Sequence, residues 1–139
     1  MISNDDKSVL AEIESFKKEA TEKTNLSDFG DPVFEEPLAA WINDLKNSAI
    51  NEFGRDFLRR LAVRDLCKRL NVIACLTENP EILEVEIPPV IFITGAARTG
   101  STLLHNLMAT HPLSRPLKRW ELMSPVPPPT PETYETDPR

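Results

Sequence analysis

The first part of the chain carries apolar residues at the spacing of amphipathic α-helices. Val9, Leu10, Ile13 and Phe16 recur with helical period, and Ser3 stands where an N-cap would be. A polar, glycine-containing stretch at residues 27–31 interrupts this pattern. The pattern therefore predicts a first helix that ends before residue 27.

Two further helices are predicted between Pro32 and Pro80. Pro32 suits a helix start, where its missing N–H would be unpaired anyway. An apolar stripe marks the helix that follows: Phe34, Leu38, Trp41, Ile42 and Leu45. Another marks a helix after Gly54: Phe57, Leu58, Leu61, Leu66 and Leu70. Residues 71–76 either continue or restart this last helix, and Asn79-Pro80 ends it.

The pattern changes at Pro88-Pro89. Residues 90–94 form a run of β-branched and aromatic side chains that favours a buried parallel strand. Helical spacing resumes at residues 101–110 and ends at His111-Pro112. Residues 117–122 are expected to form a second short strand, and residues 124–131 an extended polyproline segment.

Composition narrows the class of protein. The 139 residues include 16 Lys plus Arg against 22 Asp plus Glu, a net charge of −6 that argues against a general nucleic-acid-binding surface. The N-terminal residues are polar, unlike a signal peptide, and no apolar run reaches the length of a membrane span. Two cysteines are too few for a disulfide scaffold, so we expect a cytoplasmic protein.

The most informative segment joins the predicted strand to the helix after it. Gly95, four residues, Gly100 and then Ser101-Thr102 follow the frame of a phosphate-binding loop, G-x-x-x-x-G-K-S/T. Glycines allow backbone N–H groups to approach a phosphate, and the helix start adds unpaired N–H groups. Four glycines occur in the whole chain, so two of them five residues apart strengthen the prediction of an anion site.

The loop differs from that of nucleotide triphosphatases in its cation. Ser101 occupies the position of the lysine, and the positive charge sits earlier, at Arg98. A guanidinium makes bidentate contacts with tetrahedral oxyanions and remains charged at any working pH. The segment is therefore predicted to bind an anion other than Mg–ATP.

These residues resemble the P-loop sulfotransferases that use 3′-phosphoadenosine-5′-phosphosulfate (PAPS). The family loop reads P-R/K-S/T-G-S/T-S/T before a helix that starts L-L, and residues 97–104 match it except at Ala97, where proline is usual. The bacterial-type branch also carries a helical N-terminal region and a W-E-L…P-V-P-P-P stretch, present here as residues 120–122 and 125–129. The resemblance implies an α/β fold: a helical region at 1–87, then at 88–139 the first strand, P-loop and helix of a truncated sulfotransferase domain.

The resemblance also implies roles for individual residues. The 5′-phosphosulfate would be held by the loop and the start of its helix: Gly95, Ala97, Arg98, Thr99, Gly100, Ser101 and Thr102. Arg98 would steady the charge on the bridging oxygen, and Glu121 would accept the proton of a hydroxyl or amine acceptor. PAPS would be the co-substrate, with no metal. The family's 3′-phosphate and adenine contacts lie beyond residue 139, so we expect a fragment that is marginally stable alone.

The residues themselves leave two other functions open. A nucleotide kinase or triphosphatase shares the loop frame but places lysine at position 101. A non-catalytic helical module would use the proline-rich residues 125–131 to bind a partner. The basic residues between Arg55 and Arg69 are expected to be a solvated helix face, and His105 a partly buried helix residue.

Overall fold

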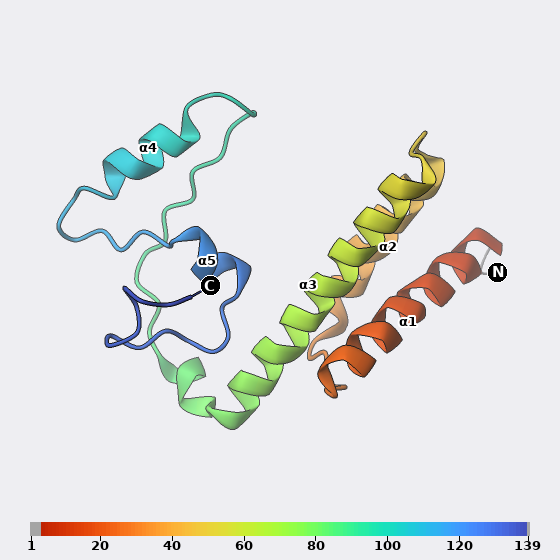
Figure 1. Ribbon diagram of the computed structural model, residues 1–139, viewed down its shortest axis with the longest axis horizontal. Helices are drawn as coiled ribbons and strands as arrows, with labels where there is room; N and C mark the ends of the chain where they lie inside the picture. Colours follow the sequence, from red (N-terminus) through yellow and green to blue (C-terminus); the bar gives the residue numbers. More distant parts are fainter. Residues whose placement is uncertain (1–3, 139) are drawn as a thin grey trace.

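The computed structural model describes the backbone of residues 4–138 and the side chains of residues 7–138. The proposed N-cap Ser3 lies outside the described residues. Three long helices form a helical body: α1 (Asn4–Thr24), α2 (Glu35–Asn47) and α3 (Glu52–Glu78). In Figure 1, α4 (Ser101–Met108) and α5 (Arg119–Met123) lie apart from this body, joined to it through the end of α3.

The core of the helical body is built around α1. This helix packs against both α3 and α2, whose axes run beside it in Figure 1. The buried side chains come from all three helices: Val9, Ile13, Phe16, Ala20, Ile42, Val63, Leu66 and Leu70. The three predicted helices are therefore confirmed, although two of the predicted core residues, Leu10 and Phe57, are about half exposed.

Local sequence sets the helix boundaries. The Asp31 carboxylate accepts the N–H of Val33 at 2.9 Å and caps a short 3₁₀ turn, η1 (Pro32–Phe34), that leads into α2. The Asn51 side chain accepts the N–H of Gly54 at 2.8 Å at the start of α3. Residues 71–76 continue α3 without a break, and Asn79 ends it by donating to the Cys75 carbonyl at 2.9 Å.

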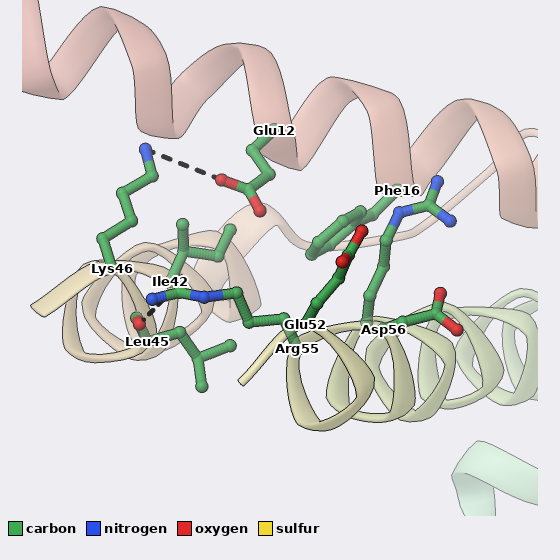
Figure 2. A pocket seen from close by; sticks show the side chains of 9 residues that line it. Glu12, Phe16, Ile42, Leu45, Lys46, Glu52, Arg55 and Asp56 are labelled. Atoms are coloured by element: carbon green, nitrogen blue, oxygen red, sulfur yellow. Dashed lines mark hydrogen bonds and ion pairs between the residues drawn. The ribbon is translucent and has the colours of Figure 1, made fainter. Parts of the chain in front are cut away.

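The basic residues of α3 fall into two groups. Arg60, Arg64 and Lys68 pair with carboxylates of α3 itself, as on a solvated face, whereas others contact neighbouring parts of the body. Arg55 donates to the carbonyls of Leu45 and Ser48 at 2.9 and 3.2 Å, which fastens the turn between α2 and α3. Arg59 pairs with Glu19 of α1 at 2.5 Å. Figure 2 shows the small cavity of about 250 Å³ beside Arg55, with Phe16 among its lining residues.

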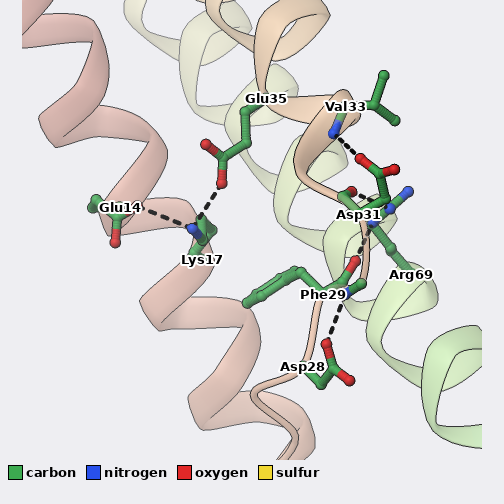
Figure 3. Close-up of polar contacts among 9 residues, drawn as sticks. Glu14, Lys17, Asp28, Phe29, Asp31, Val33, Glu35 and Arg69 are labelled. Carbon is green, nitrogen blue, oxygen red and sulfur yellow. Dashed lines mark hydrogen bonds and ion pairs between the residues drawn. The ribbon is translucent and has the colours of Figure 1, made fainter. Parts of the chain in front are cut away.

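Arg69 holds the loop between α1 and α2 against α3. Its Nε donates to the Phe29 carbonyl at 2.6 Å, and its Nη2 donates to the Asp31 carbonyl at 2.7 Å (Figure 3). The guanidinium also lies 4.4 Å from the centroid of the Phe34 ring. On the other side of this loop, Lys17 pairs with Glu35 at 2.8 Å. These contacts fix the direction in which α2 leaves the loop.

Gly30 is a point where the loop tolerates no side chain. Its φ is +66°, and a Cβ there would lie 2.7 Å from Cδ1 of Ile73. Gly30→Ala is therefore expected to lower the free energy of unfolding by about 1–3 kcal/mol, from backbone strain and crowding together. Urea unfolding followed by circular dichroism measures the loss. In the double variant with Ile73→Val, the crowding is relieved and part of the loss should be recovered; equal losses would contradict the contact.

Residues 85–95 contain no regular secondary structure, where a strand at 90–94 was predicted. A β-strand is defined by hydrogen bonds to a neighbour, and no other segment within residues 4–138 pairs with this one. The apolar side chains that suit a buried strand are instead exposed, Ile91 and Phe92 by 71% and 83%. The strand stays a prediction that needs a partner.

The second predicted strand is wrong. Residues 119–123 form the short helix α5, because Glu121 turns back to accept the N–H of Lys118, the N-cap residue, at 2.6 Å. The local hydrogen bonding of this segment is helical and does not suit a strand. The proline-rich residues after α5 contain no helix up to Thr130, and the Val126–Pro127 peptide bond is cis.

Candidate functional site: the loop at residues 95–102 and the Glu121 cluster

The predicted anion site is a tight turn that leads directly into α4. Arg98 and Gly100 both adopt left-handed backbone conformations, with φ of +68° and +89°. The Thr99 hydroxyl donates to the Ala96 carbonyl at 2.7 Å and closes the turn. A Cβ at Gly95 would lie 2.9 Å from this same hydroxyl oxygen, so glycine permits the closed turn. Ala97 lies within the turn.

The first turn of α4 faces solvent. Gly100 is its N-cap and has no side chain to cover the helix start, and Ser101 and Thr102 are the first two helical residues, both exposed. The N–H groups of a first helical turn have no partner within the helix and carry the positive end of its dipole. Backbone donors and two hydroxyls thus converge at one exposed point that suits an anion.

Arg98 supplies the positive charge of this loop. Its side chain is exposed, and within residues 4–138 no ion pair or hydrogen bond engages it. Most other arginines of the chain are engaged: those of α3 hold carboxylates or carbonyls of the body. A left-handed arginine is strained relative to glycine, and such strain gathers at binding sites. The guanidinium is therefore open to an external anion.

Glu121 lies in a second polar cluster, which also contains Arg115, Lys118 and Tyr134. The carboxylate accepts the Arg115 guanidinium at 2.7 Å and the Lys118 N–H at 2.6 Å, and the Tyr134 hydroxyl lies 3.3 Å away. Glu121 is 8% exposed and is the one charged residue that is buried among those described. We call these four residues the Glu121 cluster.

The electrostatics of the Glu121 cluster favour the carboxylate form. Burial alone would raise the pKa of Glu121, but the Lys118 N–H, the Arg115 guanidinium and the Tyr134 hydroxyl together hold that pKa below the usual glutamate value. A general base works best with a pKa near the operating pH. In this geometry Glu121 is a weak base with both oxygens already occupied.

Acid should open the Glu121 cluster. A lowered folded-state pKa means that its stabilisation is complete above the ordinary glutamate pKa and is lost as the pH falls through the lower, folded value. Trp120 lies 5.5 Å from the Tyr134 ring, so its fluorescence should change over this pH range in a Trp41→Phe background. Glu121→Gln should abolish the transition; an unchanged transition would assign it to another group.

The structure does not bring the two predicted parts of the site together. Within the described residues no hydrogen bond or ion pair joins Glu121 to residues 95–102, and α4 and α5 are separate in Figure 1. A cavity of about 360 Å³ adjoins the Glu121 cluster instead. Its lining residues are Arg115, Pro129, Thr130, Pro131 and Tyr134.

Comparison with known proteins places the last third of the chain beside a known family. Residues 89–139, which hold both the loop and the Glu121 cluster, match the model described as "Sulfotransferase family". These residues are therefore similar to the sulfotransferase family. The matched region starts at the second proline of the pair where the sequence pattern changes.

A solved sulfotransferase resembles this chain over most of this chain's length. It is sulfotransferase STF1 from Mycobacterium tuberculosis H37Rv, with 30% sequence identity and a TM-score of 0.79. The match covers 91% of this chain and therefore includes most of the helical body, which lies outside residues 89–139. It covers 35% of the solved chain, so this chain spans about a third of that sulfotransferase. No curated protein matches the chain.

The sequence predicts the loop at 95–102 from one motif, but it does not predict most of the Glu121 cluster. Arg115 and Tyr134 lie 6 and 13 residues from Glu121, and no short motif links them. None of the helices within the described residues is long and apolar enough to cross a membrane. Residues 4–138 also hold no group of three or more His, Cys, Asp or Glu side chains arranged for a metal ion.

Proposed function

We propose that the protein transfers a sulfuryl group from PAPS to a hydroxyl or amine acceptor. The observation that carries this proposal is the sulfotransferase family match over residues 89–139, because the matched residues contain the exposed loop in which Arg98, without an ion pair or hydrogen bond among the described residues, precedes the start of α4. Sulfuryl transfer depends mainly on positioning and on stabilising negative charge, as phosphoryl transfer does. An anion-binding loop is suited to this task.

Each loop residue has a distinct part in the proposed reaction. The backbone N–H groups of Gly100, Ser101 and Thr102 would hold the 5′-phosphate, with the two hydroxyls as further donors. The Arg98 guanidinium would neutralise the charge that develops on the bridging oxygen as the sulfur–oxygen bond breaks. Gly95 and Ala97 would keep the backbone close to the nucleotide, since neither carries a long side chain.

The exposed apolar residues around the loop support a larger α/β domain. Phe92, Leu103 and Leu107 are 83%, 73% and 65% exposed, an arrangement that leaves almost all of α4 and of the preceding segment without cover. A parallel sheet buries both of its faces under helices. We propose that these side chains pack against further strands and helices, and that the 90–94 segment becomes a strand there.

Nucleotide binding tests the proposed function. Adenosine 3′,5′-bisphosphate, the product left by PAPS, should bind and shift the backbone ¹H–¹⁵N resonances of residues 95–102 without Mg²⁺. Mg–ATP should bind more weakly at equal concentration, because position 101 lacks the lysine that reaches the β- and γ-phosphates. Tighter, magnesium-dependent binding of ATP would favour a nucleotide kinase and refute the proposal.

A further inference from the structure

One of the three hydroxyl groups at the candidate phosphate-binding loop is already occupied by the protein. The Thr99 hydroxyl donates to the Ala96 carbonyl at 2.7 Å. Within the described part of the chain, no hydrogen bond engages the hydroxyls of Ser101 and Thr102. A hydroxyl has a single proton to donate, and an ionised phosphate or sulfate offers only acceptors. While its bond to Ala96 lasts, the Thr99 side chain therefore has no proton to donate to an anion.

The hydrogen bond of Thr99 encloses the residue that carries the positive charge of the loop. It spans Ala97 and Arg98, and Arg98 has a φ of +68°. The left-handed conformation is unfavourable for a residue with a Cβ, and it persists where the surrounding structure fixes it. Gly100 also has a positive φ but carries no Cβ, so it needs no such restraint. The bond from Thr99 therefore restrains the one left-handed residue of this turn that needs a restraint.

Gly95 leaves room for the Thr99 hydroxyl. Unlike Gly30 and Gly100, Gly95 does not have a left-handed backbone, so its conformation does not itself demand glycine. A Cβ at Gly95 would lie 2.9 Å from the Thr99 hydroxyl oxygen, and beyond its chain neighbours it would meet no other heavy atom within 4 Å. The first glycine of the motif is therefore explained by the position of this one hydroxyl.

From this geometry we infer that Thr99 is a positioning residue: its hydroxyl closes the turn that holds Arg98 before the start of α4, Gly95 leaves space for that hydroxyl, and the Thr99 side chain does not bind the anion. The inference deepens the proposed function and rests on it for the identity of the anion. Binding then requires the closed turn. An opened turn lowers the apparent affinity in proportion to the fraction of molecules that remain closed.

Nucleotide binding to three variants tests the hydroxyl. Thr99→Val keeps the shape but loses the donor, and should weaken the binding of adenosine 3′,5′-bisphosphate by about three- to tenfold in calorimetry. Thr99→Ser keeps the donor and should restore most of the affinity. Thr110→Val is the matched control and should bind unchanged, because the Thr110 hydroxyl donates to the Leu107 carbonyl at the same 2.7 Å but at the other end of α4. Unchanged binding in Thr99→Val, or an equal loss in Thr99→Ser, would overturn the inference.

Double variants separate positioning from direct contact with the anion. Because Thr99 acts through Arg98, Thr99→Val should cause little further loss of affinity in an Arg98→Ala background. Two losses that multiply would indicate that Thr99 touches the anion itself, and would overturn the inference. Gly95→Ala should weaken binding in the otherwise unmodified protein but not in a Thr99→Ala background, where the hydroxyl that it crowds is gone. Equal losses in both backgrounds would overturn the role of Gly95.

A measurement without nucleotide keeps this inference distinct from the proposed function. The Cα and Cβ chemical shifts of Arg98 depend on its φ, and they should change in Thr99→Val but not in Thr99→Ser or Thr110→Val. Identical Arg98 shifts in Thr99→Val and the unmodified protein would overturn the inference. Failure of the unmodified protein to bind adenosine 3′,5′-bisphosphate would refute the proposed function instead, and the Arg98 shifts would still decide the role of Thr99.

Discussion

Phe16→Ala is expected to lower the free energy of unfolding of the helical body by about 3–5 kcal/mol. Phe16 is 2% exposed and is the largest of the fully buried side chains, at the centre of α1 where that helix contacts both α2 and α3. The Arg59 guanidinium carbon also lies 5.6 Å from the centroid of the Phe16 ring. A loss of this size is a large share of the stability of a small domain. Urea unfolding followed by circular dichroism at 222 nm measures it.

Phe53→Ala provides the matched control for this prediction. Phe53 belongs to α3 but is 75% exposed, so the same truncation there should change the free energy of unfolding by no more than about 0.5 kcal/mol. Similar losses in the two variants would show that the core is not centred on α1. A larger loss in Phe53→Ala would place that ring in an interface.

Arg98→Ala is expected to reduce the rate of sulfuryl transfer by roughly 10²–10³-fold. This is the usual effect of removing one hydrogen-bond donor that stabilises the negative charge of the transition state. Arg98 is the loop's one cation, and within residues 4–138 no ion pair or hydrogen bond engages it, so its removal should cost the fold little. The expected result is lost turnover of PAPS with an unchanged thermal unfolding transition. Transfer of radiolabelled sulfuryl groups to an acceptor measures the turnover.

Two further variants decide how Arg98 acts. Arg98→Lys keeps the charge but loses the planar fork, and should recover part of the turnover. Arg64→Ala removes a surface arginine of α3 that pairs with the neighbouring Asp65, and should leave turnover unchanged. Full activity in Arg98→Ala would remove this residue from the proposed mechanism, and lost activity in Arg64→Ala would indicate a general effect of net charge.

Helical period was enough to locate the body, because its apolar stripes are regular and its caps are local. Asp31 and Asn51 accept hydrogen bonds from N–H groups two and three residues away, which sequence spacing reveals. Helical periodicity alone did not predict which residues of each apolar stripe are the most buried. Ala20 is fully buried and Leu10 is 50% exposed, since the crossing of α1 with α3 selects small side chains near its end.

The predictions that the structure does not confirm are those for elements that depend on distant partners or on one side chain. The 90–94 segment has strand composition, but its state depends on hydrogen bonds from another strand. Helix α5 depends on the Glu121 carboxylate at its N-cap, which a five-residue element does not reveal through periodicity. Arg69 was assigned to a solvated face, although it holds two carbonyls some 40 residues earlier.

The candidate site also has one part that could be predicted from local sequence and one part that could not. The loop at 95–102 is contiguous, so one motif predicts all of its residues, and the tight turn observed there is compatible with that prediction. The Glu121 cluster is assembled from residues 115–134, and its donors became visible only when the chain folded back. Contiguous anion sites can be predicted from spacing, whereas the surroundings that set the pKa of a single carboxylate cannot.

The helical body has a consequence for the order of events during synthesis. Its buried core, among the described residues, draws on positions 9–70 and on nothing later. Helices with mainly local contacts fold in microseconds to milliseconds, much faster than a ribosome adds residues. The body can therefore be complete soon after α3 leaves the ribosome, while the residues that follow the body are still emerging. A nascent chain would then carry a finished N-terminal module before the exposed apolar surface of residues 85–122 emerges.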